Sequence, residues 1–174
     1  SEFFLPFQQT ELRRTIEQIL EIFGTIGVIE FDHEDGGSRL VSAPAPTSDG
    51  YASLMSLSEI IEPTLERYYI LVSLLEQHSE QKVMDLEMRA SKIGHQLSAF
   101  YGINSPEFFD KSLFATFIKS LDKEDVIKVT DGWVTASERL AEIKVLTGIT
   151  LDSDLRYDVI QLATKSVPET RQLV

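Results

Sequence analysis

The chain opens with apolar residues at helical spacing, followed by two extended segments. The helical positions are Leu12, Ile16, Ile19, Leu20 and Phe23. They predict an amphipathic helix that is capped by Thr10 and ends at Gly24. The extended segments, 26–31 and 39–43, are rich in β-branched residues and enclose a glycine-containing turn, so they predict a β-hairpin. We therefore expect a helix–hairpin unit over residues 1–46.

A segment rich in proline, glycine and serine separates this unit from a long helical pattern. Residues 47–53 are expected to form a linker. The helical stripe that follows comprises Leu54, Leu57, Ile61, Leu65, Tyr68, Val72 and Leu75. Pro63 must start or kink this helix, whose second half also carries Ile70 and Leu74 on the opposite side. Because a helix that is apolar all round is normally covered on all sides, we expect it at the centre of a core.

A second helix follows after a short connection at residues 76–81. Its seam is made of Val83, Leu86, Ala90, Ile93, Leu97 and Phe100. The alternating spacing of three and four residues is typical of a packed helix, and Gly102 is placed to end it.

A further helix start is well specified in the segment YGINSPEFFDKSLF. Ser105 is a good N-cap, and Pro106 suits the first helical position. In a helix continuous from there, Asp110 lies in the middle of the apolar half, whereas Phe108 lies on the polar side beside Lys111. A carboxylate on an apolar face must be paired or hydrogen-bonded, and an aromatic side chain on a polar face indicates that something covers it.

Two interpretations of these side chains stay open. Phe108, Asp110 and Lys111 can form a docking surface for the rest of a larger protein. Alternatively, Phe108 covers a neighbouring loop, while Asp110 caps a backbone amide or pairs with a buried arginine such as Arg89.

The last part of the chain repeats the helix–hairpin pattern. Extended segments on either side of Asp131 and Gly132 predict a second β-hairpin, and helices are expected from near Ser137 and after Asp152. The sequence therefore predicts a mainly α (α+β) fold, in which a helical bundle core carries two small β-hairpins in winged-helix-like helix–hairpin units. We expect residues 54–174 to form the helical core with the second of these units and the C-terminal helices, and the whole chain to be one compact domain.

Composition excludes several classes of function. Of the 174 residues, 28 are Asp or Glu and 16 are Lys or Arg, and the net charge of −12 disfavours binding to a phosphate backbone. The chain has no cysteine, so thiolate chemistry is excluded. The apolar stretches are too short for a membrane span, which leads us to expect a soluble fragment.

The only metal-like motif is DHEDGG, which contains His33. One histidine among acids in a glycine-rich turn is more typical of a solvated hairpin tip than of a metal site. We therefore expect no metal and no cofactor. His95 is expected to be exposed on the polar side of its helix.

Two long segments then indicate a family. TLERYYILVSLLE and LEMRASKIGHQLSAFYGINSPEFFDKSLFATFIKSL closely resemble the C-terminal region of the bacterial membrane-bound glycerol-3-phosphate acyltransferases, and EFFLPF is similar to the segment that opens that region. The resemblance is densest from Leu65 to Leu121 and weak after Trp133. It implies a parent enzyme that transfers an acyl group from acyl-CoA or acyl carrier protein to the 1-hydroxyl of glycerol 3-phosphate, the first step of phospholipid synthesis.

Catalysis in that family uses a His-x4-Asp motif, in which the histidine deprotonates the substrate hydroxyl and the aspartate orients its ring. In this chain Ser38, Val83 and Phe100 stand five residues after the three histidines, so no histidine has its aspartate. Without a general base held in place by a partner, this chain cannot deprotonate the substrate hydroxyl by the family's mechanism. The resemblance therefore implies a non-catalytic domain, and no catalytic residue is assigned.

The leading hypothesis is a C-terminal domain that stabilises, regulates or docks the catalytic acyltransferase domain of the same polypeptide. The parent is expected at the cytoplasmic face of the bacterial inner membrane, with membrane contact only through the parent, and the absence of an initial methionine suggests a chain cut from a longer one. Whether the chain forms a homo-oligomer is left open. The alternatives are an independent protein-interaction module and a winged-helix nucleic-acid-binding protein, although no nucleic-acid partner is expected.

Overall fold

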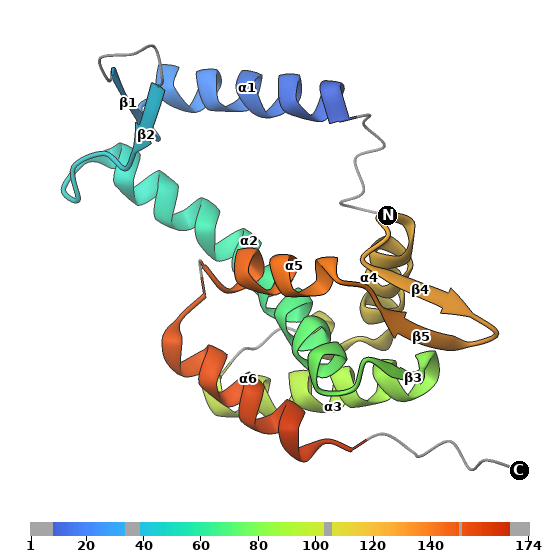
Figure 1. The fold of residues 1–174 in the computed structure, drawn as a ribbon. Helices are drawn as coiled ribbons and strands as arrows, with labels where there is room; N and C mark the ends of the chain where they lie inside the picture. The colour runs from blue at the N-terminus through green and yellow to red at the C-terminus, as the bar shows by residue number, and fades with distance from the viewer. Residues whose placement is uncertain (1–8, 34–38, 103–105, 150, 168–174) are drawn as a thin grey trace, which may run out of the picture. The chain divides into compact units, whose positions relative to one another are not determined.

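The computed structural model describes residues 9–33, 39–102, 106–149 and 151–167 (Figure 1). Six α-helices, one 3-10 helix and two antiparallel sheets are found in these residues. This confirms the predicted mainly helical α+β class. The chain divides into two compact units, residues 1–61 and 62–174.

The first unit contains the predicted helix and hairpin. Helix α1 spans Gln9–Thr25, and strands β1 (Glu30–His33) and β2 (Arg39–Ser42) pair antiparallel. The helix boundaries differ from the prediction, because Thr10 lies inside α1 and Gly24 does not end it. Gly24 instead packs closely against Phe31, and a Cβ atom there, 2.3 Å from the ring, would force the ring to move.

Helix α2 spans Asp49–Gln77 and begins inside the predicted linker. Ser48 caps it, because its hydroxyl oxygen accepts a hydrogen bond from the backbone N–H of Tyr51 at 3.1 Å. Residues 49–53 are therefore helical, and the division between the two units falls after Ile61 rather than at 47–53. Pro63 lies in the interior of α2, close to this division.

The second unit combines helices with a small three-stranded sheet. Its elements after α2 are β3 (Glu80–Lys82), α3 (Val83–Tyr101), the 3-10 helix η1 (Pro106–Phe109), α4 (Lys111–Lys123), β4 (Ile127–Thr130), β5 (Trp133–Ala136), α5 (Arg139–Gly148) and α6 (Ser153–Lys165). The strand order is β3-β5-β4, all antiparallel. The elements from α2 to β5 follow the order helix, strand, helix, helix, strand, strand, apart from η1, and the first strand pairs with the last. Winged-helix domains have this same order. Strand β3 lies in what the sequence pattern predicts to be a short connection.

The core of the second unit surrounds the second half of α2. Every residue from Tyr69 to Leu75 is buried. The surrounding elements contribute Leu86, Ala90, Ile93 and Leu97 from α3, Phe114, Phe117, Ile118 and Leu121 from α4, Val134 from β5, and Leu155, Val159 and Ala163 from α6. The prediction of a central helix covered on all sides is confirmed. The apolar stripe predicted for α3 packs against the core up to Leu97, but Phe100 does not, because it is 76% exposed.

No helix in the described parts of the chain combines the length and the hydropathy that a bilayer span requires.

The hairpin between β4 and β5 has the backbone that its sequence predicts. Asp131 and Gly132 both have positive φ, 51° and 77°, as a two-residue type I′ turn requires. Only glycine adopts this region without a steric cost at the second position.

Substitution of Gly132 by alanine is therefore expected to lower the free energy of unfolding by about 1 kcal/mol. The measurement is urea unfolding of the 174-residue chain. Asp131→Asn is the matched control, because asparagine tolerates the same region, and it should stay within about 0.5 kcal/mol of the parent sequence. Equal stability of both variants would contradict the turn assignment.

Candidate functional site

The segment from Pro106 to Lys111 contains a helix break that the sequence pattern does not predict. Residues Pro106–Phe109 form η1, Asp110 is extended with φ −66° and ψ 121°, and α4 begins at Lys111. The Asp110 carboxylate accepts a hydrogen bond from the backbone N–H of Ser112 at 2.8 Å, so Asp110 is the N-cap of α4. The predicted N-cap, Ser105, lies outside the described residues.

The break moves Phe108 into the core. Its side chain is fully buried, and the Arg67 guanidinium lies 5.9 Å from the centre of its ring and 5.8 Å from that of Phe117. Tyr68 stacks on Phe117, with 4.3 Å between the centres of the two rings. The expectation that Phe108 lies on a polar helix face is therefore wrong, because the helix is not continuous through Asp110.

Helix α3 forms the support for η1. The hydroxyl of Ser91 donates a hydrogen bond to the carbonyl of Phe109 at 2.7 Å. Gly94 also faces η1, and a Cβ atom there would lie in van der Waals contact with it, 3.4 Å from the carbonyl oxygen of Phe108. The ring of His95 lies 4.9 Å from that of Phe109, and His95 is exposed as predicted.

The predicted docking surface is thus reduced to two exposed residues. Asp110 does not pair with Arg89 but caps α4, and the hydrogen bond from the Ser112 backbone holds the pKa of its carboxyl below the usual range. Lys111 is exposed at the first position of α4. A role of Asp110 and Lys111 in docking stays a prediction, whereas Phe108 is buried and acts through packing.

Arg89 organises a buried polar network that the sequence does not reveal. It donates hydrogen bonds to the Gln81 side chain at 2.6 Å and to the Ser166 hydroxyl at 3.0 Å, and also to the Ser166 carbonyl. The Gln81 amide in turn donates to the carbonyl of His78 at 2.7 Å. Burial lowers the pKa of Arg89, and the nearby Asp85 carboxylate opposes this shift. The network ties β3 and α3 to the end of α6.

Glu66 is the titratable group with the most informative shift. It lies on α2 with 7% of its surface exposed. Burial, reinforced by the negative charge of Glu62, raises its pKa to about 7, although the positive charge of Arg67 acts in the opposite direction. A large fraction of this carboxyl is therefore protonated at neutral pH.

The two histidines whose side chains the structure describes, His78 and His95, have no carboxylate partner of the kind that catalysis requires. His78 is half-buried, and burial together with the charge of Arg89 lowers its pKa. Neither His78 nor His95 hydrogen-bonds a carboxylate within the described residues. The described residues contain no group of three or more His, Asp or Glu side chains placed to bind a metal ion, and the turn at 34–38 lies outside them.

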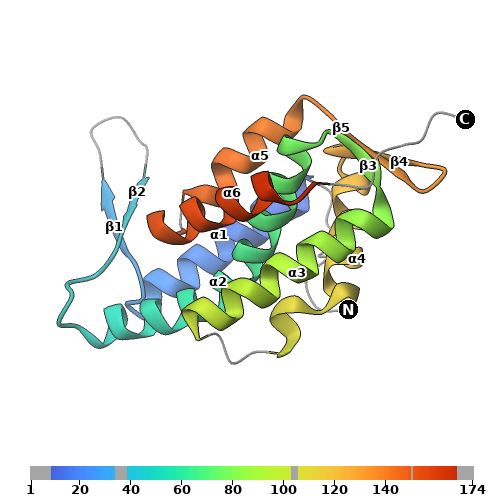
Figure 2. The same ribbon diagram turned by 90° about the horizontal axis from the view of Figure 1, so that it is seen from below.

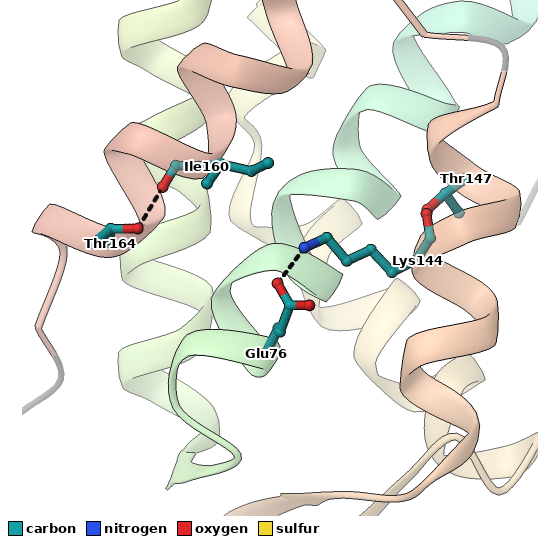
Figure 3. A network of polar contacts seen from close by, with 5 residues as sticks. All are labelled: Glu76, Lys144, Thr147, Ile160 and Thr164. Atoms are coloured by element: carbon teal, nitrogen blue, oxygen red, sulfur yellow. Dashed lines mark hydrogen bonds and ion pairs between the residues drawn. The ribbon is translucent and has the colours of Figure 1, made fainter. Parts of the chain in front are cut away.

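A first cavity, of about 360 Å³, lies between the end of α2 and the start of α5. Its lining is mainly apolar and includes Leu75, Ala136 and Leu140. Figure 3 shows Lys144 reaching from α5 to the carboxylate of Glu76 on α2, so the basic residue that lines it is already paired. The same view shows the hydroxyl of Thr164 bonded to the carbonyl of Ile160 within α6. Its remaining polar lining residues are Ser79, Ser137 and Glu138, and the lining includes no histidine.

A second cavity, of about 490 Å³, lies between the end of α3 and α6 and is lined by aromatic side chains. We name it the aromatic groove; its residues include Phe100, Tyr101, Tyr157, Asp158, Leu162 and Lys165. The hydroxyl of Tyr101 donates a hydrogen bond to the Asp158 carboxylate at 2.8 Å, and this bond raises the pKa of Tyr101 to about 12. Sequence reasoning missed this groove, although Tyr157 stands between the buried core positions Leu155 and Val159 of α6.

Comparison with known proteins gives a consistent family relationship. Residues 1–130 match the family described as glycerol-3-phosphate acyltransferase C-terminal region. A protein named glycerol-3-phosphate acyltransferase from Pseudomonas fluorescens (strain Pf0-1) is 34% identical over 167 residues, which is 94% of this chain and 19% of that protein. A protein of the same name from Actinobacillus pleuropneumoniae serotype 5b (strain L20) is 30% identical over 174 residues, 100% of this chain and 20% of that protein.

The chain spans about one fifth of the length of the curated relatives that it matches. No solved structure matches it.

Truncation of Phe108 tests the core assignment. Phe108→Ala is expected to lower the free energy of unfolding by about 3–5 kcal/mol, because it removes a fully buried ring. Lys111→Ala, an exposed neighbour, should change it by less than about 0.5 kcal/mol. Urea unfolding of both variants is the measurement, and similar stabilities would show that Phe108 is not a core residue.

The raised pKa of Glu66 predicts a pH dependence of stability. In the unfolded chain its pKa returns to the ordinary value of 4.5, so the folded state binds the proton more tightly. The stability from this group is complete below about pH 4.5 and is lost as the pH rises through about 7. After allowance for solvent screening, we expect a loss of about 1–2 kcal/mol between pH 5 and pH 8.

The measurement is urea unfolding at both pH values for Glu66→Gln and for the exposed control Glu59→Gln on the same helix. Glu66→Gln should remove this contribution, whereas Glu59→Gln should retain it. If the stability of the two variants depended on pH in the same way, the raised pKa of Glu66 would be contradicted.

Proposed function

Because the chain belongs to the family of glycerol-3-phosphate acyltransferase C-terminal regions, we propose that it is the non-catalytic C-terminal domain of a glycerol-3-phosphate 1-O-acyltransferase. The parent enzyme transfers an acyl group from acyl-CoA or acyl carrier protein to the 1-hydroxyl of glycerol 3-phosphate, at the first step of phospholipid synthesis. The observation that carries this proposal is the family match over residues 1–130.

The absence of an oriented base in the described residues supports a non-catalytic role. Acyl transfer to a hydroxyl needs a group that removes its proton while the hydroxyl attacks the acyl carbon. No histidine of the sequence is followed by an aspartate at the family's spacing. His78 and His95 have no carboxylate partner among the described residues. Catalysis is therefore assigned to the part of the parent outside this chain.

The proposed role is to stabilise, regulate or dock the catalytic acyltransferase domain of the same polypeptide. The second unit has a well-packed core, and it also exposes large aromatic side chains at the aromatic groove. Such exposed aromatic residues are typical of protein–protein interfaces. We place the parent at the cytoplasmic face of the bacterial inner membrane, with membrane contact through the parent, and we leave self-association open.

The winged-helix order of elements is better explained by protein binding than by nucleic-acid binding. Helix α4, in the position of a recognition helix, carries Lys111, Lys119 and Lys123, but Asp110 and Asp122 lie on or beside it. The net charge of −12 also opposes binding to a phosphate backbone.

The proposal predicts that the isolated chain has no acyltransferase activity. With glycerol 3-phosphate and acyl-CoA, its rate should equal the rate without protein, whereas the full-length parent should show turnover. The measurement is incorporation of labelled glycerol 3-phosphate into lysophosphatidate. Turnover by the isolated chain above the background would refute a non-catalytic role.

Removal of the region from the parent is the complementary experiment. The truncated parent should lose activity or accumulate as unfolded protein, because its partner domain is missing. A truncated parent that remains folded and fully active would show that the region does not act on the catalytic domain.

A further inference from the structure

The aromatic groove lies between two helices that run antiparallel. At one end, Tyr101 of α3 is bonded to Asp158 in the second turn of α6, and at the other end Arg89 of α3 is bonded to Ser166 just after α6. Both helices belong to the second unit and are labelled in Figure 2. These hydrogen bonds link the two helices that form the walls of the groove.

The groove exposes large aromatic side chains that a packed domain would normally bury. Phe100 is 76% exposed, Tyr157 is 62% exposed and Tyr101 is 43% exposed. Phe100 continues the apolar seam of α3 beyond the point where the core ends. Aromatic residues gathered around a concave surface are the commonest anchors of protein–protein interfaces.

The charges along the groove differ between its two ends. At the end marked by Tyr101, the carboxylates of Asp158, Asp154 and Asp152 all act on the tyrosine hydroxyl. Lys165 lines the other end, about two turns further along α6. Arg156, which also lies on α6, packs beside Gly148 of α5. A partner would therefore meet an acidic end and a basic end on either side of apolar rings.

We propose that the aromatic groove binds a basic amphipathic segment from the part of the parent polypeptide outside this chain. The segment places lysine or arginine at the Asp158 end, where the cation also contacts the aromatic rings, and an apolar side chain between Phe100 and Tyr157. This inference rests on the proposed function, and it names the surface through which the domain docks.

Two observations select this occupant. The curated relatives are about five times as long as this chain, so most of each relative lies outside the matched region. Because the net charge is −12, two copies of the chain repel each other. The aspartates at the groove likewise repel an anionic lipid surface.

The experiment uses the full-length parent in detergent, with a protease site inserted ahead of this region. After cleavage, the region should co-elute with the rest of the parent on size exclusion. Phe100→Ser and Tyr157→Ser together should weaken this association by about tenfold or more. Met84→Ser, at a residue of α3 that is 78% exposed and outside the groove, is the matched control and should associate normally. Circular dichroism melting of each variant region should match the parent sequence, because these side chains lie outside the core.

The outcomes separate this inference from the proposed function. If the double variant associates as tightly as the parent sequence, the groove is not the docking surface, although the domain still docks. If the unmodified region separates after cleavage and the remainder keeps full activity, docking itself fails. If the released region binds vesicles of phosphatidylethanolamine and phosphatidylglycerol and the double variant does not, the groove faces the membrane and the proposal is overturned.

Discussion

The second unit depends on the complete burial of one helical segment. From Tyr69 to Leu75, α2 has no solvent-exposed side chain, so every direction around it must be covered by another element. Helices α3, α4 and α6 and the three-stranded sheet provide that cover, and each contributes an apolar face to the common core. Because interiors are packed densely, the loss of one covering side chain leaves a cavity that costs several kcal/mol. The arrangement of the remaining elements follows from this requirement.

The helix break at Asp110 shows how the unit completes this cover. A continuous helix from Pro106 would direct Phe108 away from the core and Asp110 into it. The 3-10 turn followed by an extended Asp110 reverses both placements, so that Phe108 is buried near Arg67 and Asp110 caps α4 in solvent. Ser91 of α3 supports this geometry, because its hydroxyl donates a hydrogen bond to the carbonyl of Phe109.

The features that could be predicted from the sequence are those with local causes. Helical spacing predicts the helices, and the Asp131–Gly132 turn predicts the second hairpin, because each signal acts within a few residues. Strand β3 could not be predicted, because Glu80–Lys82 has little intrinsic strand preference and is fixed by pairing with β5 and by the bonds of Gln81 to Arg89 and to the His78 carbonyl.

The candidate site was harder to predict than the fold. The position of Phe108 was mispredicted because a helical wheel assumes an unbroken helix. The aromatic groove joins Tyr101 to Asp158, which are 57 residues apart, and no local pattern brings such residues together. Phe100 continues the seam of α3, so its sequence pattern resembles that of a core residue, and only the tertiary structure shows that the core ends at Leu97.

The central claim is that this domain is folded in itself and that its aromatic groove contacts the rest of a larger acyltransferase. Hydroxyl-radical footprinting of the full-length parent and of the isolated chain tests it directly, because side-chain oxidation reports solvent exposure. Phe100 and Tyr157 should be oxidised in the isolated chain and protected in the parent, while Met84 reacts equally in both. Equal oxidation of Phe100 and Tyr157 in the two proteins would contradict the account.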